Sequence, residues 1–201
     1  MSEVEIQQFI DNYLAALSRI KISEASIKLL RKKLSVVRVK SRQTLVHPGE
    51  VGKNVYLVVS GGFVCRHVHE KTGVAKTINF YLDDLHPVMA RVDSFFTQEV
   101  SSCELMAITE SIIITLPKVL LDVLIKEDPS FARFYYELVI TAMVEENEVK
   151  TALIAFSSKE RYDFIFQEMP SVVQRVPSKY IAEFCGISAE WLSKLKKQKG
   201  G

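Results

Sequence analysis

One segment near the C-terminus constrains the fold more than any other, because it meets three structural demands at fixed spacing. It spans residues 178–197 and reads SKYIAEFCGISAEWLSKLKK. Ala182 is small where two helices would cross, Gly186 can adopt the positive φ that reverses the chain, and Ser188 can cap the following helix. The apolar residues that would anchor both helices are Ile181, Cys185, Ile187, Leu192 and Leu195. The spacing predicts two short helices joined by a tight turn, which is typical of a DNA-binding helix-turn-helix.

The second helix of this pair would expose the side chains that could read DNA, because it is the one that enters the major groove. Glu190 could accept a hydrogen bond from a cytosine amino group, whereas Ser193 and Lys194 could hold a phosphate or a guanine. Trp191 could touch a thymine methyl group or fold back onto the preceding helix, and both interpretations stay open. An ordinary helical hairpin with a lysine-rich, solvated end is the competing interpretation of the segment. The candidate DNA-binding residues are Ser188, Ala189, Glu190, Trp191, Ser193, Lys194 and Lys197.

The composition is that of an ordinary globular chain. Its 201 residues are 48% hydrophobic and 25% charged, which suffices for one large domain and one small one. Since the net charge is only +2, affinity for nucleic acid has to come from local clusters of cations. No apolar run reaches the length of a membrane span and no signal peptide is evident, so we expect a cytoplasmic protein without membrane contact. Cys65, Cys103 and Cys185 are widely spaced, and we expect reduced core residues, with no metal or cofactor.

The rest of the chain divides into a helical start, a β region and a long helix. Helical spacing over 6–17, and again over 23–34 with Ser23 as the cap of the second helix, predicts two packing helices. Over 36–116 the apolar period falls to near two, in short runs separated by glycine turns, the last run being Leu105 to Leu116 in our interpretation. This pattern predicts a barrel or jelly roll of antiparallel strands. A helix-start signal, Asp-Pro-Ser, opens a long helical pattern over 128–155, and residues 156–158 form a hinge after it.

The long helical pattern carries an apolar stripe on alternating four- and three-residue steps. Such a stripe predicts a helix that pairs two subunits into a homodimer, with Glu145 as an interruption that needs a partner. A helix that packs on its own β domain is the alternative. The stripe consists of Phe131, Tyr135, Leu138, Ala142, Val149 and Ala152, and the first five are the candidate dimer residues.

The order of these parts resembles the Crp/Fnr family of bacterial transcription regulators. The resemblance is carried by LVHPGEVGKNVYLVVSGGF at 45–63 and SKERYDFIFQEMPSVVQRVPSKYIAEFCGISAEWLSKLKK at 158–197. In that family a glutamate and an arginine four residues later read bases, which implies this role for Glu190 and puts Lys194 in the arginine's place. Ala189 replaces a second arginine that often precedes the glutamate. Because lysine lacks arginine's bidentate fork, we expect a different operator from the best-known family site.

The family's organisation implies an α+β fold in three parts. These are a cyclic-nucleotide-binding-like sensor domain at 1–127, with an N-terminal antiparallel β jelly roll and flanking helices, a long dimerisation helix at 128–155, and a small helix-turn-helix domain at 156–201. The resemblance implies a homodimeric, sequence-specific transcription regulator. Its partners would be double-stranded DNA, RNA polymerase and, if one exists, an unidentified small-molecule effector.

The resemblance fails at the ligand pocket. Nucleotide-binding members use a Gly-Glu pair for the ribose and an Arg-Ser/Thr-Ala run for the cyclic phosphate. Ala90 and Arg91 stand in place of the pair, and Ser101, Ser102 and Cys103 in place of the run. Without the phosphate arginine, we expect no tight binding of cyclic AMP in the usual geometry. Arg91 and the three run residues form the candidate effector pocket, in which Arg91 either attracts an anion from the opposite wall or lies on the surface of an irregular loop.

Other functions find less support in the sequence. No cysteine precedes Cys65, so an N-terminal iron-sulfur cluster has no ligands. His67 and His69 share one strand face but lack a third metal ligand. We find no phosphate-binding glycine loop and no nucleophile motif, and we expect no enzyme. The alternative to a regulator is a small-molecule-binding or protein-interaction module with a degenerate DNA-binding domain.

Overall fold

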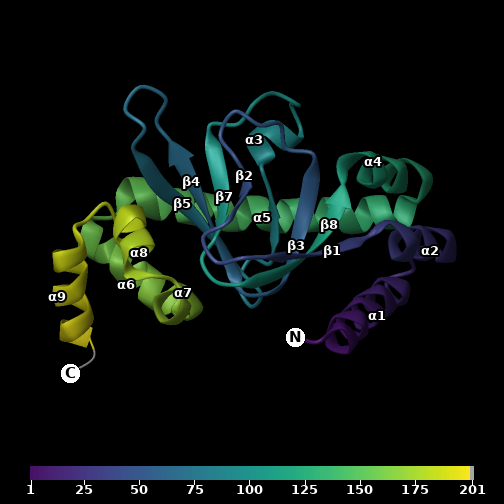
Figure 1. Ribbon diagram of the computed structural model, residues 1–201, viewed down its shortest axis with the longest axis horizontal. Helices are drawn as coiled ribbons and strands as arrows, with labels where there is room; N and C mark the ends of the chain where they lie inside the picture. Colours follow the sequence, from purple (N-terminus) through teal and green to yellow (C-terminus); the bar gives the residue numbers. More distant parts are fainter. Residues whose placement is uncertain (200–201) are drawn as a thin grey trace.

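The structure is a computed structural model that describes residues 1–199, apart from the side chains of Asp93, Lys196, Gln198 and Lys199. It is an α+β fold, and Figure 1 shows the long helix α5 extending along the molecule beside two β-sheets. The chain begins with α1 (Glu3–Arg19) and α2 (Glu24–Lys33). The β region comprises β1 (Ser35–Val39), β2 (Thr44–Val46), β3 (Asn54–Ser60), β4 (Gly62–Val68), β5 (Ala75–Leu82), β6 (Val88–Ala90), the short α3 (Val92–Phe95), β7 (Cys103–Ala107) and β8 (Ser111–Pro117). It is followed by α4 (Lys118–Glu127), α5 (Pro129–Ala155), α6 (Ser158–Glu168), α7 (Pro170–Arg175), α8 (Ser178–Cys185) and α9 (Ala189–Lys199).

The two N-terminal helices begin at serine caps. Ser2 and Glu5 form a capping box, in which each side chain accepts a hydrogen bond from the other residue's backbone N–H. Ser23 caps α2, as the sequence predicted. The apolar side of α1 packs against one sheet together with α2, α4 and the start of α5, and its buried residues are Ile6, Ile10, Leu14 and Leu17. Both predicted helices are confirmed.

Two antiparallel four-stranded sheets form the predicted jelly roll, with strand orders β1-β8-β3-β6 and β2-β7-β4-β5. Gly61 reverses the chain between β3 and β4 with a φ of +94°. A Cβ at Gly61 would lie 2.3 Å from the Oγ atom of Ser111, so both the backbone conformation and the space require glycine here. The side chains that fill the interior between the sheets include Tyr56, Val58, Phe63, Cys65, Met89, Leu105 and Ile113.

The structure corrects the predicted β region in one place and adds elements to it. The run from Leu105 to Leu116 is two strands, because β7 ends at Ala107 and β8 begins at Ser111, on the far side of a turn. The short strand β6 and the helix α4 had no sequence prediction. Helix α4 follows Pro117 and buries Leu120, Leu121 and Leu124, a spacing that could have indicated it.

Helix α5 confirms the long helix predicted over 128–155, and Asp128 caps it. The Oδ1 atom of Asp128 accepts hydrogen bonds from the backbone N–H groups of Ser130 (3.0 Å) and Phe131 (3.1 Å). The Oδ2 atom accepts one from the N–H group of Ser23 (2.9 Å), which is the cap residue of α2. One buried carboxylate therefore holds the starts of two helices together.

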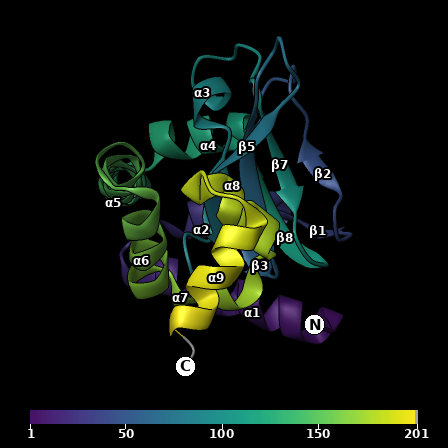
Figure 2. The ribbon, with the colours of Figure 1, turned by 90° about the vertical axis from the view of Figure 1, so that its left-hand side faces the viewer.

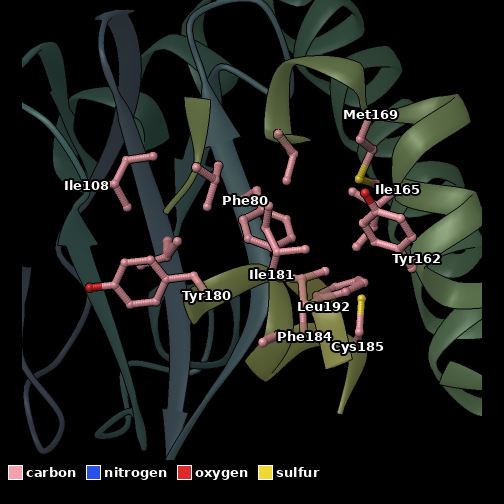
Figure 3. Packing of buried hydrophobic residues seen from close by; sticks show 14 of the residues in the cluster. Phe80, Ile108, Tyr162, Ile165, Met169, Tyr180, Ile181, Phe184, Cys185 and Leu192 are labelled. Carbon is pink, nitrogen blue, oxygen red and sulfur yellow. The ribbon is translucent and has the colours of Figure 1, made fainter. Parts of the chain in front are cut away.

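The C-terminal helices pack against the sheet that contains β5. Figure 2 views this end of the molecule, with α8 and α9 in front of β5. Phe80 and Leu82 of β5 share a buried cluster with Ile181 and Phe184 of α8, and the rings of Phe80 and Phe184 lie 5.2 Å apart (Figure 3). Because this apolar core continues from the helices into the sheet, the boundary at residue 156 does not coincide with a break in packing. The three-part division of the chain stays a prediction.

Candidate nucleic-acid interface and effector site

The C-terminal helix pair has the turn geometry that its sequence predicted. Helix α8 ends at Cys185, and Gly186 adopts the left-handed conformation with a φ of +69°. The N–H group of Ile187 then donates to the carbonyl of Ala182 (3.0 Å), which closes the turn. The Oγ atom of Ser188 accepts a hydrogen bond from the backbone N–H of Trp191 (3.2 Å) and so caps α9.

The inner faces of both helices are buried as predicted. Ile181, Cys185 and Leu192 have no measurable exposure, and Ala182 and Leu195 are almost fully covered. Burial raises the pKa of the Cys185 thiol to about 12, so the thiol is neutral and unreactive at ordinary pH. The carbonyl of Cys185 accepts a hydrogen bond from the Nη1 atom of Arg161 (3.0 Å), which ties α6 to the turn. Arg161 was not among the residues singled out in the sequence.

The outer face of α9 is open to solvent. A hydrogen bond from Ser188 holds the pKa of the Glu190 carboxyl below its ordinary value, so Glu190 is a charged acceptor at neutral pH. Trp191 is 43% exposed, which leaves part of its ring available to a partner. The structure brings all seven candidate residues to the exposed surface: Ser188, Ala189, Glu190, Trp191, Ser193, Lys194 and Lys197. The hydrogen-bond acceptor Glu190 and the cations Lys194 and Lys197 therefore lie on one accessible helix.

Glu183 of α8 fixes the helix pair to the outside of the jelly roll. Its carboxylate accepts hydrogen bonds from Arg66 through Nε (3.1 Å) and Nη2 (3.2 Å), and from the hydroxyl of Thr77 (2.9 Å). Arg66 also pairs with Glu104 on the neighbouring strand (2.7 Å). The ring of Tyr180 lies 5.6 Å from the guanidinium carbon of Arg66. These contacts set the orientation of α8 relative to β4 and β5.

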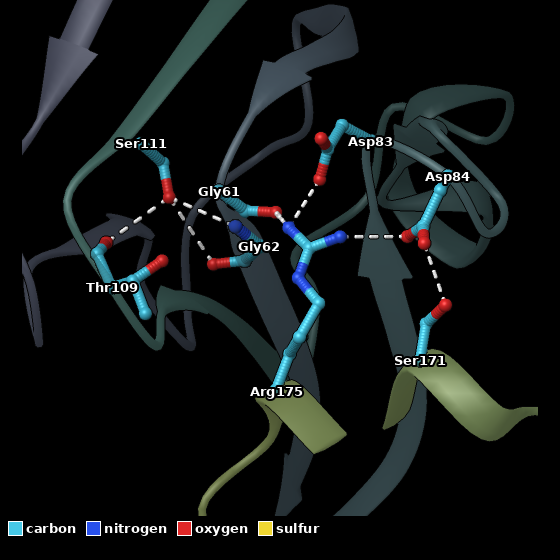
Figure 4. Close-up of polar contacts among 8 residues, drawn as sticks. All are labelled: Gly61, Gly62, Asp83, Asp84, Thr109, Ser111, Ser171 and Arg175. Carbon is cyan, nitrogen blue, oxygen red and sulfur yellow. Dashed lines mark hydrogen bonds and ion pairs between the residues drawn. The ribbon is translucent and has the colours of Figure 1, made fainter. Parts of the chain in front are cut away.

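A second polar contact joins α7 to the same sheet (Figure 4). Arg175 donates to Asp84 through Nη1 (2.8 Å) and to the carbonyl of Gly61 through Nη2 (2.9 Å), and it also pairs with Asp83. Ser171 donates to the other oxygen of Asp84 (2.6 Å). The two adjacent aspartates are therefore docking residues for α7, a role that their sequence context did not indicate.

The candidate effector residues separate into two groups. Arg91 is only 6% exposed, so its placement on a surface loop is wrong. Its Nε atom donates to the hydroxyl of Ser101 (3.1 Å), and its Nη1 atom lies 2.7 Å from the sulfur of Cys65 inside the jelly roll. The Oγ atom of Ser102 and the sulfur of Cys103 instead lie 3.1 Å and 3.8 Å from Nδ1 of His67. The structure thus brings Arg91 and Ser101 together and buries Cys103 in the same interior cluster as Cys65, whereas the Ser102 hydroxyl faces His67.

The apolar stripe predicted for dimerisation faces the chain's own core for most of its length. Phe131 and Val149 are each 3% exposed, and Tyr135 and Leu138 are partly covered by the N-terminal half of the chain. Ala142 is exposed. For Phe131, Tyr135, Leu138 and Val149, but not for Ala142, the structure agrees with the alternative, namely a helix that packs on its own chain. Glu145, which interrupts the stripe, lies 3.9 Å from Nε2 of His86.

A different face of α5 is both apolar and exposed. It presents large side chains to solvent at Tyr136, Ile140, Met143, Val144 and Ile154, with exposed fractions between 42% and 74%. Steps of four and three residues connect Tyr136, Ile140 and Met143, and Asn147 and Ile154 continue the same heptad pattern. This face, which we call the exposed α5 stripe, lies on the opposite side of the helix from the predicted stripe.

Three negative findings concern the described part of the chain. None of its helices has the length and apolar character that crossing a membrane requires. Among its described side chains, no group of three or more His, Cys, Asp or Glu residues is arranged to hold a metal ion. The three cysteines are buried and form no disulfide with one another.

No family model matches the chain, and no curated protein sequence matches it. Several solved structures, however, match the chain in fold. FixK2 from Bradyrhizobium japonicum is 15% identical, with a TM-score of 0.69 over 82% of this chain and 83% of that one. A regulator from Eubacterium rectale assigned to the Crp/Fnr family is 17% identical, with a TM-score of 0.66 over 88% and 82%. The c-di-GMP-responsive global regulator CLP from Xanthomonas campestris is 14% identical, with a TM-score of 0.64 over 89% and 92%. The chain therefore has the fold of Crp/Fnr-type regulators.

Proposed function

We propose that the chain is a homodimeric, sequence-specific transcription regulator of the Crp/Fnr type that binds double-stranded DNA through α9. One observation carries the proposal: a left-handed turn at Gly186 leads directly into a helix whose outer face is polar, charged and exposed. The likeness in fold to a Crp/Fnr regulator over most of the chain supports it. A regulator of this kind acts in the cytoplasm, and RNA polymerase is a further partner suggested by the family resemblance.

In this proposal the residues of α9 have separate roles. Glu190 accepts a hydrogen bond from a base edge, since an ionised carboxylate accepts from the cytosine amino group. Lys194 contacts a guanine or a phosphate as a point charge, and Lys197 contacts a phosphate. Ser188, Ala189, Trp191 and Ser193 complete the surface that faces the groove. The acceptor at Glu190 supplies sequence preference, whereas the lysines supply most of the affinity and its dependence on salt.

We further propose that the dimer forms along the exposed α5 stripe rather than along the stripe around Phe131. Solvent-exposed Ile140 and Met143 would become buried against a second copy. Asn147 would lie within the seam, where a single polar residue fixes register and the number of helices. Two α9 helices related by a two-fold axis would then enter successive major grooves about 34 Å apart, as in other helix-turn-helix dimers.

Cyclic AMP in the usual family geometry is not the effector in this proposal. Arg91 is held by Ser101 and lies against Cys65, and the position expected to carry the phosphate-binding arginine is the buried serine Ser101. The arginine available to a cyclic phosphate would be Arg91, which lies on the opposite wall of the pocket from the family's phosphate-binding arginine. We expect the apo protein to bind DNA without nucleotide.

Selection of binding sites from fragmented genomic DNA tests the proposal, with purified protein at near-physiological salt and no added nucleotide. The wild-type chain should enrich a two-fold-symmetric sequence. Glu190→Ala should relax preference at one position in each half-site by about 1–3 kcal/mol, while keeping the overall site. The control Glu70→Ala changes an exposed glutamate in the β4–β5 turn and should leave the selected sequence unchanged.

The alternative function gives a different result. A small-molecule-binding or protein-interaction module with a degenerate DNA-binding domain would enrich no sequence, either alone or with cell extract added as a source of effectors. Its residual DNA binding would show the steep salt dependence of phosphate contacts and no response to Glu190→Ala.

A further inference from the structure

A small cavity lies on the outer side of the β1-β8-β3-β6 sheet, separate from the interior that contains Arg91. Its volume is about 70 Å³. Three walls border it, and its remaining side is partly open to solvent. The walls are the N-terminal helices, the outer face of the sheet and the first turns of α5. Representative side chains of these walls are Leu17, Leu30, Leu57, Ile114, Tyr135 and Leu138.

The chemistry of the cavity wall selects for an apolar occupant. Every described residue that lines it is aliphatic or aromatic, and the hydroxyl groups of Tyr13 and Tyr135 are the polar atoms among their side chains. Burial raises the pKa of both hydroxyls, so both are neutral. A water molecule needs two to four polar partners to be stable in a buried site, and apolar cavities of about 150 Å³ stay dry and bind benzene or xenon.

We propose that this cavity binds a small, uncharged, apolar molecule, from the size of a gas atom up to that of a short hydrocarbon. The volume sets the upper limit, because it is roughly half that of the cavities that accept benzene. The lack of cations among the described wall residues excludes nucleotides and other anions as ligands of this site. The site is therefore distinct in place and in chemistry from the nucleotide pocket that the family resemblance implies.

The cavity is placed so that its occupant acts on the exposed α5 stripe. Tyr135 and Leu138 line the cavity, whereas Tyr136 and Ile140, in the same turns of α5, belong to the stripe. An occupant that separates α5 from the sheet would move both faces together, because packed helices shift as rigid units. The effector role rests on the proposed function. The ligand would regulate DNA binding if its affinity differs between the α5 position seen here and a shifted position of α5.

Xenon is the probe that tests the site, and methyl-resolved NMR of the full-length chain is the measurement. Xenon-saturated buffer should produce saturable shifts at the methyl groups of Leu57, Ile114 and Leu138. The methyl groups of Ile181 and Leu192, which lie in the separate buried cluster around Phe80, should not respond. No saturable shift, or equal shifts in both clusters, would overturn the site.

Two variants make the test specific. Leu138→Phe should fill the cavity and abolish the xenon shifts. Leu138→Ala should enlarge it, so that benzene raises the midpoint of thermal unfolding of this variant by several degrees. The matched control Leu105→Ala removes a fully buried leucine from the jelly-roll interior and should show no benzene effect at the Leu57 methyl groups. If Leu138→Phe does not fold, the response of Leu138→Ala to benzene decides.

The regulatory step has its own readout. With the selected operator, xenon should change the dissociation constant of the wild-type chain severalfold and leave that of Leu138→Phe unchanged. Xenon shifts without a change in DNA affinity would overturn the effector role while the site stands. Because the NMR experiment uses no DNA, a chain that binds no operator would refute the proposed function without affecting the test of the cavity.

Discussion

Asp128 shows how one buried carboxylate can connect distant parts of the chain. It is 4% exposed and accepts hydrogen bonds from the starts of both α2 and α5. Burial by itself would raise the pKa of this carboxyl, but the hydrogen bonds from Ser23, Ser26 and Phe131 outweigh burial and hold the pKa well below its ordinary value. The ionised form is therefore the one that the fold stabilises.

Replacing this carboxylate should lower stability in a pH-dependent way. Asp128→Ala leaves buried N–H groups without acceptors and should cost about 2–4 kcal/mol of the free energy of unfolding at pH 7. Since the folded pKa is depressed, the contribution is fully present above about pH 5 and is lost as the pH falls below about 4 toward the folded pKa. Urea unfolding of wild type and variant across this range checks both points. A difference that grew on acidification would contradict the assignment.

Substitutions at Lys194 test whether this residue contacts a base in the proposed DNA complex. Lys194→Arg restores a planar fork that can donate two hydrogen bonds to one guanine, which lysine cannot do. We expect the variant to gain about 1–3 kcal/mol of discrimination for guanine at one position in each half-site. Lys194→Ala should instead reduce the slope of log affinity against log salt by about one contact. Site selection and salt titration measure the two effects, and an unchanged preference in Lys194→Arg would mean that the residue does not face a base.

At the scale of elements, the turn between α8 and α9 depends on glycine. Gly186 has a φ of +69°, where an L-residue costs about 1–2 kcal/mol, and a Cβ there would lie 3.2 Å from Nη1 of Arg161. Gly186→Ala should therefore lower stability and, by disturbing the angle between the helices, also lower DNA affinity. Gly73→Ala is the matched control, since Gly73 has a φ of +66° and no atom lies within 4 Å of the place where a Cβ would be added. Equal effects of both variants on DNA affinity would contradict a specific role for the turn.

The elements could be predicted from sequence wherever a local signal defines them. The Asp-Pro-Ser start of α5, the serine cap of α2 and the turn at Gly186 each act within a few residues, and each was confirmed. The two faces of α5 could not be distinguished, because both carry apolar residues at heptad spacing. Only the packing of α1, α2 and α4 determines that Phe131 is covered and Ile140 is not.

The exposed face of the candidate site could be predicted from the sequence, but the long-range contacts that position it could not. The outer face of α9 follows from helical periodicity, and all seven predicted residues are exposed. The ion pair between Arg66 and Glu183 joins residues 117 positions apart, and a single sequence holds no information on which distant charges meet. The burial of Arg91 was missed for the same reason, because it depends on Ser101 and Cys65, which lie on other segments.

At the scale of the whole molecule, one substitution in the exposed α5 stripe tests the proposed dimer. Met143 is 63% exposed at the middle of the stripe, so Met143→Glu would place a charge in the seam of the proposed dimer without disturbing the core of one chain. We expect this variant to be a folded monomer in sedimentation experiments where the wild type is a dimer. Val119→Glu, at an apolar residue of α4 that is 77% exposed, is the matched control and should stay dimeric.

The same variant connects assembly to DNA binding. A monomer presents one α9 to one half-site, so Met143→Glu should lose most of its affinity for the full operator while its contacts within a half-site are unchanged. Affinity for an isolated half-site should then be similar in the variant and the wild type. If Met143→Glu stayed dimeric, the dimer would have to use another surface, and if it became monomeric with full operator affinity, the two-fold model of recognition would be wrong.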